Sequence, residues 1–104
     1  MIKIKINYDN DFIKDFKISG HALYDEHGKD IVCASVSSII LCSVEAIANF
    51  DIDAVDIKQT KDKLEIIINK EDNITDKLIK NMLNCLKELE KKYPKNIEII
   101  DKEE

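Results

Sequence analysis

From Ile31 to about Asn49 the chain carries a single charged residue, Glu45, and apolar or small side chains occupy nearly every side of the predicted helix. Asp30 precedes this stretch and belongs to the residue types that favour a helix N-cap. A helix that is apolar all round has to be covered on more than one side. Because a chain of 104 residues supports only one modest core, we expect a sheet to cover one side and a second copy of the chain to cover another.

The rest of the sequence predicts that sheet. Apolar and polar residues alternate in two N-terminal runs separated by turn-forming residues, which indicates a β-hairpin. The predicted elements are, in order, strands at 2–7 and 12–21, a helix at 31–49, strands at 52–58 and 63–69, a helix at 74–93 and a strand at 97–100. This ββαββαβ order predicts an α+β fold, with two helices packed on one mainly antiparallel sheet. We expect a single domain over residues 1–104.

The second helix has the pattern of an ordinary surface helix. Asn73 is its expected cap, because Asn side chains accept the first backbone N–H groups, and Pro94 is its expected stop. The stripe that should face the sheet consists of Leu78, Met82, Leu86 and Leu89.

The charge and hydropathy of the chain limit which classes of partner and which cellular compartment we expect. The formal net charge is −5 and no block of Lys or Arg stands out, so nucleic acid is not an expected partner. The N-terminal residues do not resemble a signal peptide. The longest nearly uncharged stretch, Ile31 to Val44, is too short to span a bilayer. We therefore expect a cytoplasmic protein without membrane partners, whose Cys33, Cys42 and Cys85 are free thiols.

One His and one Cys form the strongest chemical pattern. His21 ends a predicted strand, and Cys33 occupies the third position of the following helix if Asp30 is the N-cap. There the helix dipole and unpaired backbone N–H groups favour a thiolate, and the same N–H groups could hold an oxyanion. The dipole contributes only about 0.3–1 kcal/mol, so a protonated His21 within hydrogen-bond reach would be needed to activate the thiol.

Less reactive interpretations stand beside this one. A Cys in an apolar helix is usually a small core residue, and we interpret Cys42 and Cys85 in that way. Strand alternation places His21 on the face opposite Phe16 and Ile18, although the adjacent Gly20 would allow a bulge that redirects the side chain. The His and Cys residues do not have the paired spacing of a structural zinc site, so we expect no metal and no other cofactor.

The motif residues closely resemble the ribosomal-processing cysteine protease family, called Prp. The residues that carry the resemblance are Gly20-His21-Ala22, Gly28 with Asp30, and Ile31-Val32-Cys33-Ala34 through Val36-Ser37. The resemblance covers essentially the whole chain. It implies a homodimeric endopeptidase that removes the N-terminal extension of large-subunit ribosomal protein twenty-seven and cuts after paired aromatic residues.

The resemblance also implies roles for individual residues. Cys33 would be the nucleophile and His21 the general base. The residues expected to bind substrate or support the site are Gly20, Ala22, Asp30 and Ser37. Asp30 could either cap the helix or orient His21, and both possibilities stay open. The loop from Leu23 to Lys29 is expected to order over the bound peptide.

Two further functions remain possible from the residues alone. One is a non-catalytic homodimeric module that binds a ribosomal or other basic protein, and the other is a structural dimer without a ligand site. Only the enzyme needs a reactive thiol at Cys33, so the reactivity of that thiol separates the three interpretations.

Overall fold

The computed structural model describes residues 1–21 and 30–101. Its elements are β1 (Ile2–Asp9), β2 (Phe12–Ser19), α1 (Ile31–Phe50), β3 (Val55–Gln59), β4 (Lys63–Ile68), α2 (Asn73–Lys92) and β5 (Ile97–Asp101). The ββαββαβ order is the predicted one, and the predicted α+β fold is confirmed.

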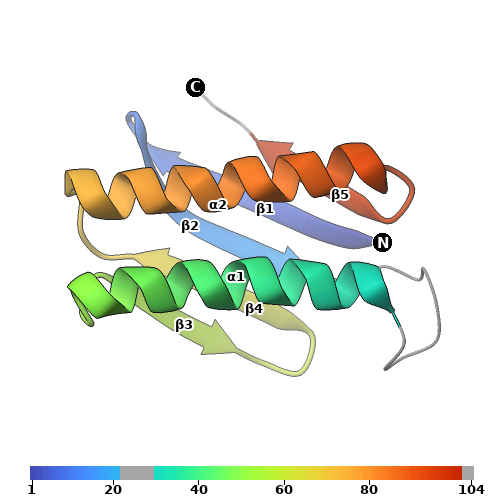
Figure 1. Cartoon of the computed structure of the whole chain (residues 1–104), viewed down its shortest axis with the longest axis horizontal. Coiled ribbons are helices and arrows are strands. Elements are labelled where there is room, and N and C mark those ends of the chain that lie inside the picture. The colour runs from blue at the N-terminus through green and yellow to red at the C-terminus, as the bar shows by residue number, and fades with distance from the viewer. Residues whose placement is uncertain (22–29, 102–104) are drawn as a thin grey trace.

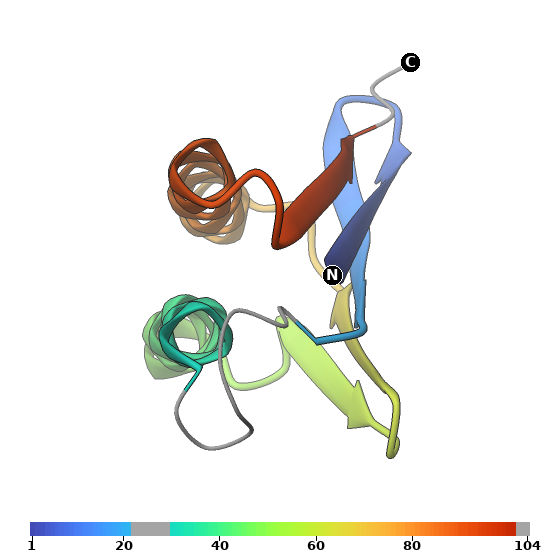
Figure 2. The same ribbon diagram turned by 90° about the vertical axis from the view of Figure 1, so that its right-hand side faces the viewer.

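One five-stranded sheet carries both helices on the same face (Figures 1 and 2). The strand order is β3-β4-β2-β1-β5. Neighbouring strands pair antiparallel except β1 and β5, which run parallel. As the alternation of apolar and polar residues in the N-terminal hairpin predicts, one face of β1 and β2 is buried under the helices. Its residues Ile4, Ile6 and Phe16 are fully buried. β1 and β2 therefore form the centre of the core.

The strands differ from their predicted bounds at two turns: β1 extends to Asp9, two residues beyond its predicted end, and β3 begins later than predicted. The hairpin turn is confined to Asn10 and Asp11, and Asn10 adopts a φ of 57°, a left-handed conformation that Asn tolerates. β3 begins at Val55 and not at residue 52. The N–H of Ala54 donates to the carbonyl of Asp51 at 3.1 Å, and the side chain of Ile52 is 75% exposed. The apolar character of Ile52 therefore does not reflect a strand.

The second helix differs from its prediction at the cap and along the stripe. Asp72, not Asn73, is the N-cap, because its Oδ1 accepts the N–H of Thr75 at 2.8 Å. Of the predicted stripe, Met82 and Leu86 are buried, while Leu78 and Leu89 lie at the core margin. The positions completing the buried face are Thr75, Ile79 and Leu83.

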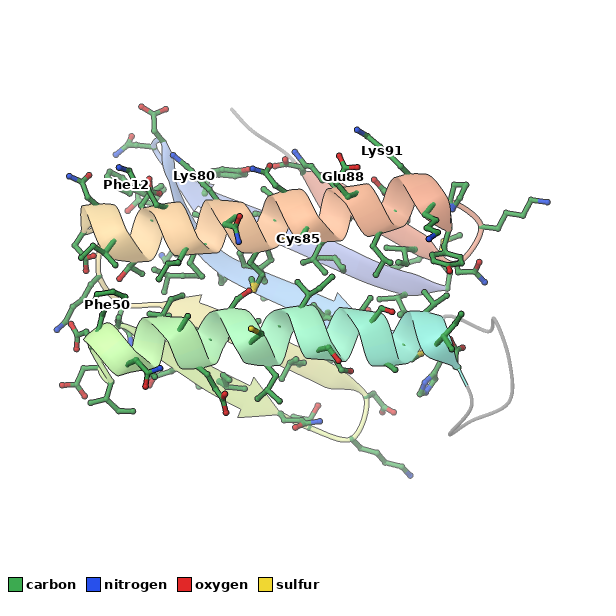
Figure 3. All side chains as sticks on the ribbon, viewed as in Figure 1. Phe12, Phe50, Lys80, Cys85, Glu88 and Lys91 are labelled. Atoms are coloured by element: carbon green, nitrogen blue, oxygen red, sulfur yellow. The ribbon has the colours of Figure 1, made fainter. Side chains whose placement is uncertain are left out.

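Cys42 and Cys85 are exposed free thiols, so their interpretation as core residues is wrong. The core side of α1 is formed by Val32, Val36, Ile40 and Ile47. Cys42 lies outside this stripe, and Cys85, labelled on α2 in Figure 3, lies outside the buried face of its own helix. Cys33 is half-buried and also carries a free thiol.

α1 is longer than the uncharged stretch suggested. With 20 residues it is long and apolar enough to cross a membrane by length and composition alone, so the expectation based on residues 31–44 does not hold for the complete helix. One side of α1, formed by Val32, Val36, Ile40 and Ile47, packs against the sheet (Figure 2). On its outer side Leu41 is 60% exposed, and at its last residue Phe50 is 69% exposed.

Asp101 fastens β5 to both β1 and α2. Its carboxylate accepts a hydrogen bond from Tyr8 Oη at 2.6 Å and pairs with Lys87 Nζ at 2.7 Å. Burial raises the pKa of Asp101, but the hydrogen bonds from Lys87 and Tyr8 and the charge of Lys87 outweigh it and lower the pKa below its ordinary value. The carboxylate form therefore stabilises the parallel β1–β5 pair, which begins at Ile2.

Candidate active site

A cleft of about 460 Å³ opens at the end of the sheet where β2 ends and α1 begins. Its lining comes from Ile2, from residues 18–21, from one side of α1 and from residues 59–64 between β3 and β4. Four of the six predicted site residues line this one cleft: Gly20, His21, Cys33 and Ser37. The fold therefore brings the predicted nucleophile and the predicted base to the same space.

Asp30 places Cys33 at the start of α1. Its Oδ1 accepts the N–H groups of Val32 and Cys33 at 2.9 and 3.0 Å. Its carbonyl accepts the N–H of Ala34 at 3.1 Å. This is the expected N-cap geometry, and of the two roles left open for Asp30 the structure shows this one. Cys33 thus lies at the positive end of the helix dipole.

The hydrogen bonds to Asp30 occupy two of the N–H groups at the start of α1, where an oxyanion site was expected. The sequence predicts that unpaired N–H groups at the start of this helix could hold a developing oxyanion, but those of Val32 and Cys33 donate to the Asp30 carboxylate. An oxyanion could use them only by displacing that carboxylate, which would cost the helix its cap. The start of α1 can therefore stabilise negative charge in the site through its dipole. The N–H groups of Val32 and Cys33 are engaged with the Asp30 carboxylate.

Gly20 turns the chain away from β2 immediately before His21. It adopts a φ of +83°, and a Cβ at this position would lie only 2.3 Å from the carbonyl oxygen of Met1. Only glycine fits this conformation and this close approach. Because β2 ends at Ser19, His21 does not continue the strand face opposite Phe16 and Ile18. The expected redirection of the side chain occurs through the strand end and a left-handed glycine, not through a bulge.

The remaining predicted residues divide between the cleft and the undescribed part of the chain. Ser37 lies one helical turn after Cys33, and its exposed side chain lines the cleft on the same side of α1. Ala22 and the loop from Leu23 to Lys29 lie outside the described residues. Within residues 1–21 and 30–101, no group of three or more His, Cys, Asp or Glu side chains could hold a metal ion.

Sequence reasoning did not find two parts of the cleft. The apolar floor consists of Ile2, Ile18, Val36, Ile40 and Leu64. One wall consists of residues 59–64, which the sequence indicated only as a connection at 59–62 and the start of the strand predicted at 63–69. No local motif marks these residues, because their place beside Cys33 follows from the pairing of β4 with β2.

Comparisons with known proteins identify the family to which the chain is similar. The family model of cysteine protease Prp matches residues 1–98. The ribosomal processing cysteine protease Prp of Staphylococcus aureus (strain Mu50) is 31% identical over 101 residues, which cover 94% of each chain. The Prp of Mycoplasma genitalium is 43% identical over 58 residues, covering 56% of this chain and 52% of that one.

Solved structures show the same fold. A crystal structure of Prp from S. aureus with a covalently linked product peptide has a TM-score of 0.89 and 29% identity, and the match covers 98% of this chain and 100% of that one. The same protease with a substrate peptide has a TM-score of 0.84 and 27% identity, at the same coverage of both chains.

Proposed function

Because the chain belongs to the Prp family of cysteine proteases, we propose that it removes the N-terminal extension of large-subunit ribosomal protein twenty-seven. Cys33 is the nucleophile and His21 the general base. The observation that carries the proposal is the cleft that Cys33 and His21 line together, with Cys33 at the start of α1. We place this reaction in the cytoplasm, where ribosomal proteins are made.

The proposed reaction proceeds by acyl transfer. His21 takes the proton of the Cys33 thiol, and the thiolate attacks the carbonyl carbon of the scissile peptide bond. The tetrahedral intermediate collapses, the C–N bond breaks, and the leaving amine takes the proton from His21. A water molecule, deprotonated by His21, then hydrolyses the thioester, which releases the new carboxylate and restores the thiol.

The floor of the cleft fits the proposed cleavage preference. It is apolar, with Ile18, Val36 and Leu64 near the base of the cleft, and apolar pockets bind aromatic side chains by removing their surface from water. A pair of aromatic residues before the scissile bond would bury one ring there. Ser37 and Gly20 border the same space and are proposed to position the peptide backbone.

Incubation with the precursor of the ribosomal protein tests the proposal. The wild-type chain should shorten the precursor at one site, and Cys33→Ala should leave it intact, because no thiolate remains to form the acyl-enzyme. Mass spectrometry of the product identifies the bond that is cut. Ala34→Ser, one residue further along an exposed part of α1, serves as the matched control and should keep processing. Equal processing by wild type and Cys33→Ala would contradict the proposal.

We further propose that the active protein is a homodimer that covers the outer side of α1. Ile31, Leu41 and Phe50 are 53%, 60% and 69% exposed, and Figure 3 shows Phe50 at the end of α1. Large apolar side chains exposed along one helix are typical of a protein interface. A second copy of the chain supplies the matching apolar face, since a two-fold interface is self-complementary.

Sedimentation at high micromolar concentration measures the proposed dimer. The wild-type chain should sediment as a dimer. Leu41→Glu should shift it to monomer with unchanged helix content, because a buried unpaired carboxylate at the interface is unfavourable. Asn81→Glu, which places the same charge on an exposed position of α2, should not. A wild-type chain that is monomeric at this concentration would refute the dimer.

A further inference from the structure

We propose that the free edge of β3 binds the substrate as an added strand, beside the cleft that holds the scissile bond. A substrate segment that flanks this bond runs along β3 in an extended conformation, and its backbone forms hydrogen bonds with those of Val55, Ile57 and Gln59. The inference rests on the proposed peptide cleavage and specifies how the substrate is held outside the cleft.

The hydrogen bonds between β3 and β4 show which backbone groups of β3 are free. The N–H of Thr60 donates to the carbonyl of Lys63 at one end of the pair, and the N–H of Asn69 donates to the carbonyl of Ala54 at the other. Such bonded residues alternate with residues whose N–H and C=O groups point away from the partner strand. The register between the two ends has no shift. The residues that turn these groups to the outer edge are Val55, Ile57 and Gln59.

The described part of the chain leaves this edge open. β3 is the first strand in the sheet order, and it forms the lower edge of the sheet in Figure 2. Within residues 1–21 and 30–101, no hydrogen bond outside the β3–β4 pair uses the backbone of Val55, Ile57 or Gln59. The side chain of Ile57 is 46% exposed, although its partner Ile66 is fully buried on the helix side of the sheet. A bound chain therefore has access to the free groups.

The other edge strand of the sheet, β5, is closed by α2. The N–H of Ile99, in the middle of β5, donates to the carboxylate of Glu90 on α2 at 2.7 Å. Asp101, at the end of β5, pairs with Lys87 of the same helix. A row of free N–H and C=O groups is a template for pairing with another chain, and proteins cover or blunt such edges. This chain covers β5 in that way, and no described residue does the same for β3.

The free edge of β3 leads into the cleft. Gln59, the last residue of β3, lines the cleft together with Cys33 and His21. The start of α1, the end of β2 and the β3–β4 turn all lie at the same end of the molecule (Figures 1 and 2). A substrate with its scissile bond at Cys33 can therefore continue along β3. There Ile57 and Val55 offer further N–H and C=O groups at every second residue.

This mode of binding predicts a period of two along the substrate. Every second residue of an added strand turns its N–H and C=O groups to the edge, and the residues between turn theirs away. Removing one backbone N–H from the substrate should therefore slow cleavage only at alternate positions. The loss of one such hydrogen bond should lower kcat/KM by about two- to ten-fold.

N-methylated peptides test the inference on the full chain. All contain the same cleavage segment with extensions on both sides, and one backbone N–H at a time is replaced by N-methyl, except next to the scissile bond. With the wild-type chain, kcat/KM should fall at alternate positions of one flank and stay near the value of the unmodified peptide between them. Equal losses at consecutive positions, or no loss on either flank, would overturn the inference.

Ile57→Pro removes a hydrogen bond of the same pair from the protein side. Because the N–H of Ile57 points outward, a proline there leaves the bonds to β4 intact and blocks strand addition. Ile57→Pro should lower kcat/KM for the unmodified peptide by about ten-fold and weaken the alternating effect of N-methylation. Ile57→Ala keeps the N–H and should keep the alternating pattern, which separates the backbone from the side chain.

Asn73→Pro is the matched control for the proline. Asn73 is exposed at the first position of α2, where proline is tolerated, and the start of α2 lies at the other end of the molecule from the cleft (Figure 1). Asn73→Pro should keep both kcat/KM and the alternating pattern. Wild-type kcat/KM in a folded Ile57→Pro chain would overturn the inference. If thermal unfolding shows that Ile57→Pro does not fold, the peptide series with the wild-type chain decides alone.

Two other outcomes are distinguishable from these. If the wild-type chain cleaves no unmodified peptide, the protease assignment of the cleft fails. If it cleaves the unmodified peptide without an alternating pattern, only the role of β3 fails. If Ile57→Pro converts a dimer to a monomer in sedimentation, a second copy of the chain occupies the edge, and the inference is overturned.

Discussion

Replacing Gly20 with alanine is expected to lower kcat/KM for peptide cleavage by about 100-fold or more, since a displacement near 1 Å at a reacting group has effects of this size. Gly20 has a φ of +83°, and the added Cβ would lie 2.3 Å from the carbonyl oxygen of Met1. That oxygen belongs to the backbone and has no side-chain freedom with which to move away. The chain at residue 20 must therefore shift, and His21 shifts with it.

The same substitution should also lower the free energy of unfolding, because an L-residue in the left-handed region costs about 1–2 kcal/mol before any clash is counted. Asn10→Ala is the matched control. Asn10 also has a positive φ, but it lies in the β1–β2 turn at the opposite end of β2 from Gly20. The Asn10→Ala variant should be less stable than the wild type, but its folded fraction should have the wild-type kcat/KM. Thermal unfolding and steady-state kinetics measure the two effects, and a Gly20→Ala chain with wild-type kcat/KM would show that Gly20 does not position His21.

Replacing His21 with alanine is expected to reduce cleavage by about 10²–10⁴-fold, the usual contribution of a general base. It should also abolish selective alkylation of Cys33. The helix dipole remains in this variant, but it contributes only about 0.3–1 kcal/mol. The thiol of Cys33 should then react more slowly than in the wild type, even though Asp30 still caps α1.

The other two cysteines, Cys42 and Cys85, serve as internal references for the labelling rate of Cys33. Cys42 and Cys85 are exposed, whereas Cys33 is half-buried. Access alone would therefore make Cys33 the slowest of the three to react with iodoacetamide. The labelling is monitored by mass spectrometry. If Cys33 is labelled fastest in the wild type, its thiol is activated. In His21→Ala the order should reverse to the one that access dictates, while Ser37→Ala, in the same cleft, should keep the wild-type order. Slow labelling of Cys33 in the wild type would argue against the proposed pair.

The features predicted correctly from the sequence depend on residues close together in the chain. Alternation places Ile4 and Phe16 in the core whatever the neighbouring strand is, because side chains of a strand alternate between its two faces. Asp30 caps α1 through N–H groups two and three residues away. Cys33 consequently lies in the first turn of a helix, as the spacing predicts.

The errors arise where several positions look alike in the sequence and either tertiary packing or a local hydrogen bond selects one of them. Cys42 is as apolar as its neighbours on α1, yet only the side of the helix that meets the sheet is buried. Asn73 is a good capping residue, but Asp72 is placed to accept the N–H of Thr75 instead. Ile52 resembles a strand residue, but the turn after Asp51 leaves it exposed.

The apolar helix α1 was determined locally, as were its cap at Asp30 and the position of Cys33 on it. The surroundings of that thiol were decided by the tertiary structure. The pairing of β4 with β2 brings residues 59–64 to the cleft, and the left-handed Gly20, packed over Met1, brings His21 there. Short-range patterns specify helices, strands and caps because their hydrogen bonds join nearby residues. The composition of a cleft depends on strand order and register, which are set by contacts between residues far apart in the chain.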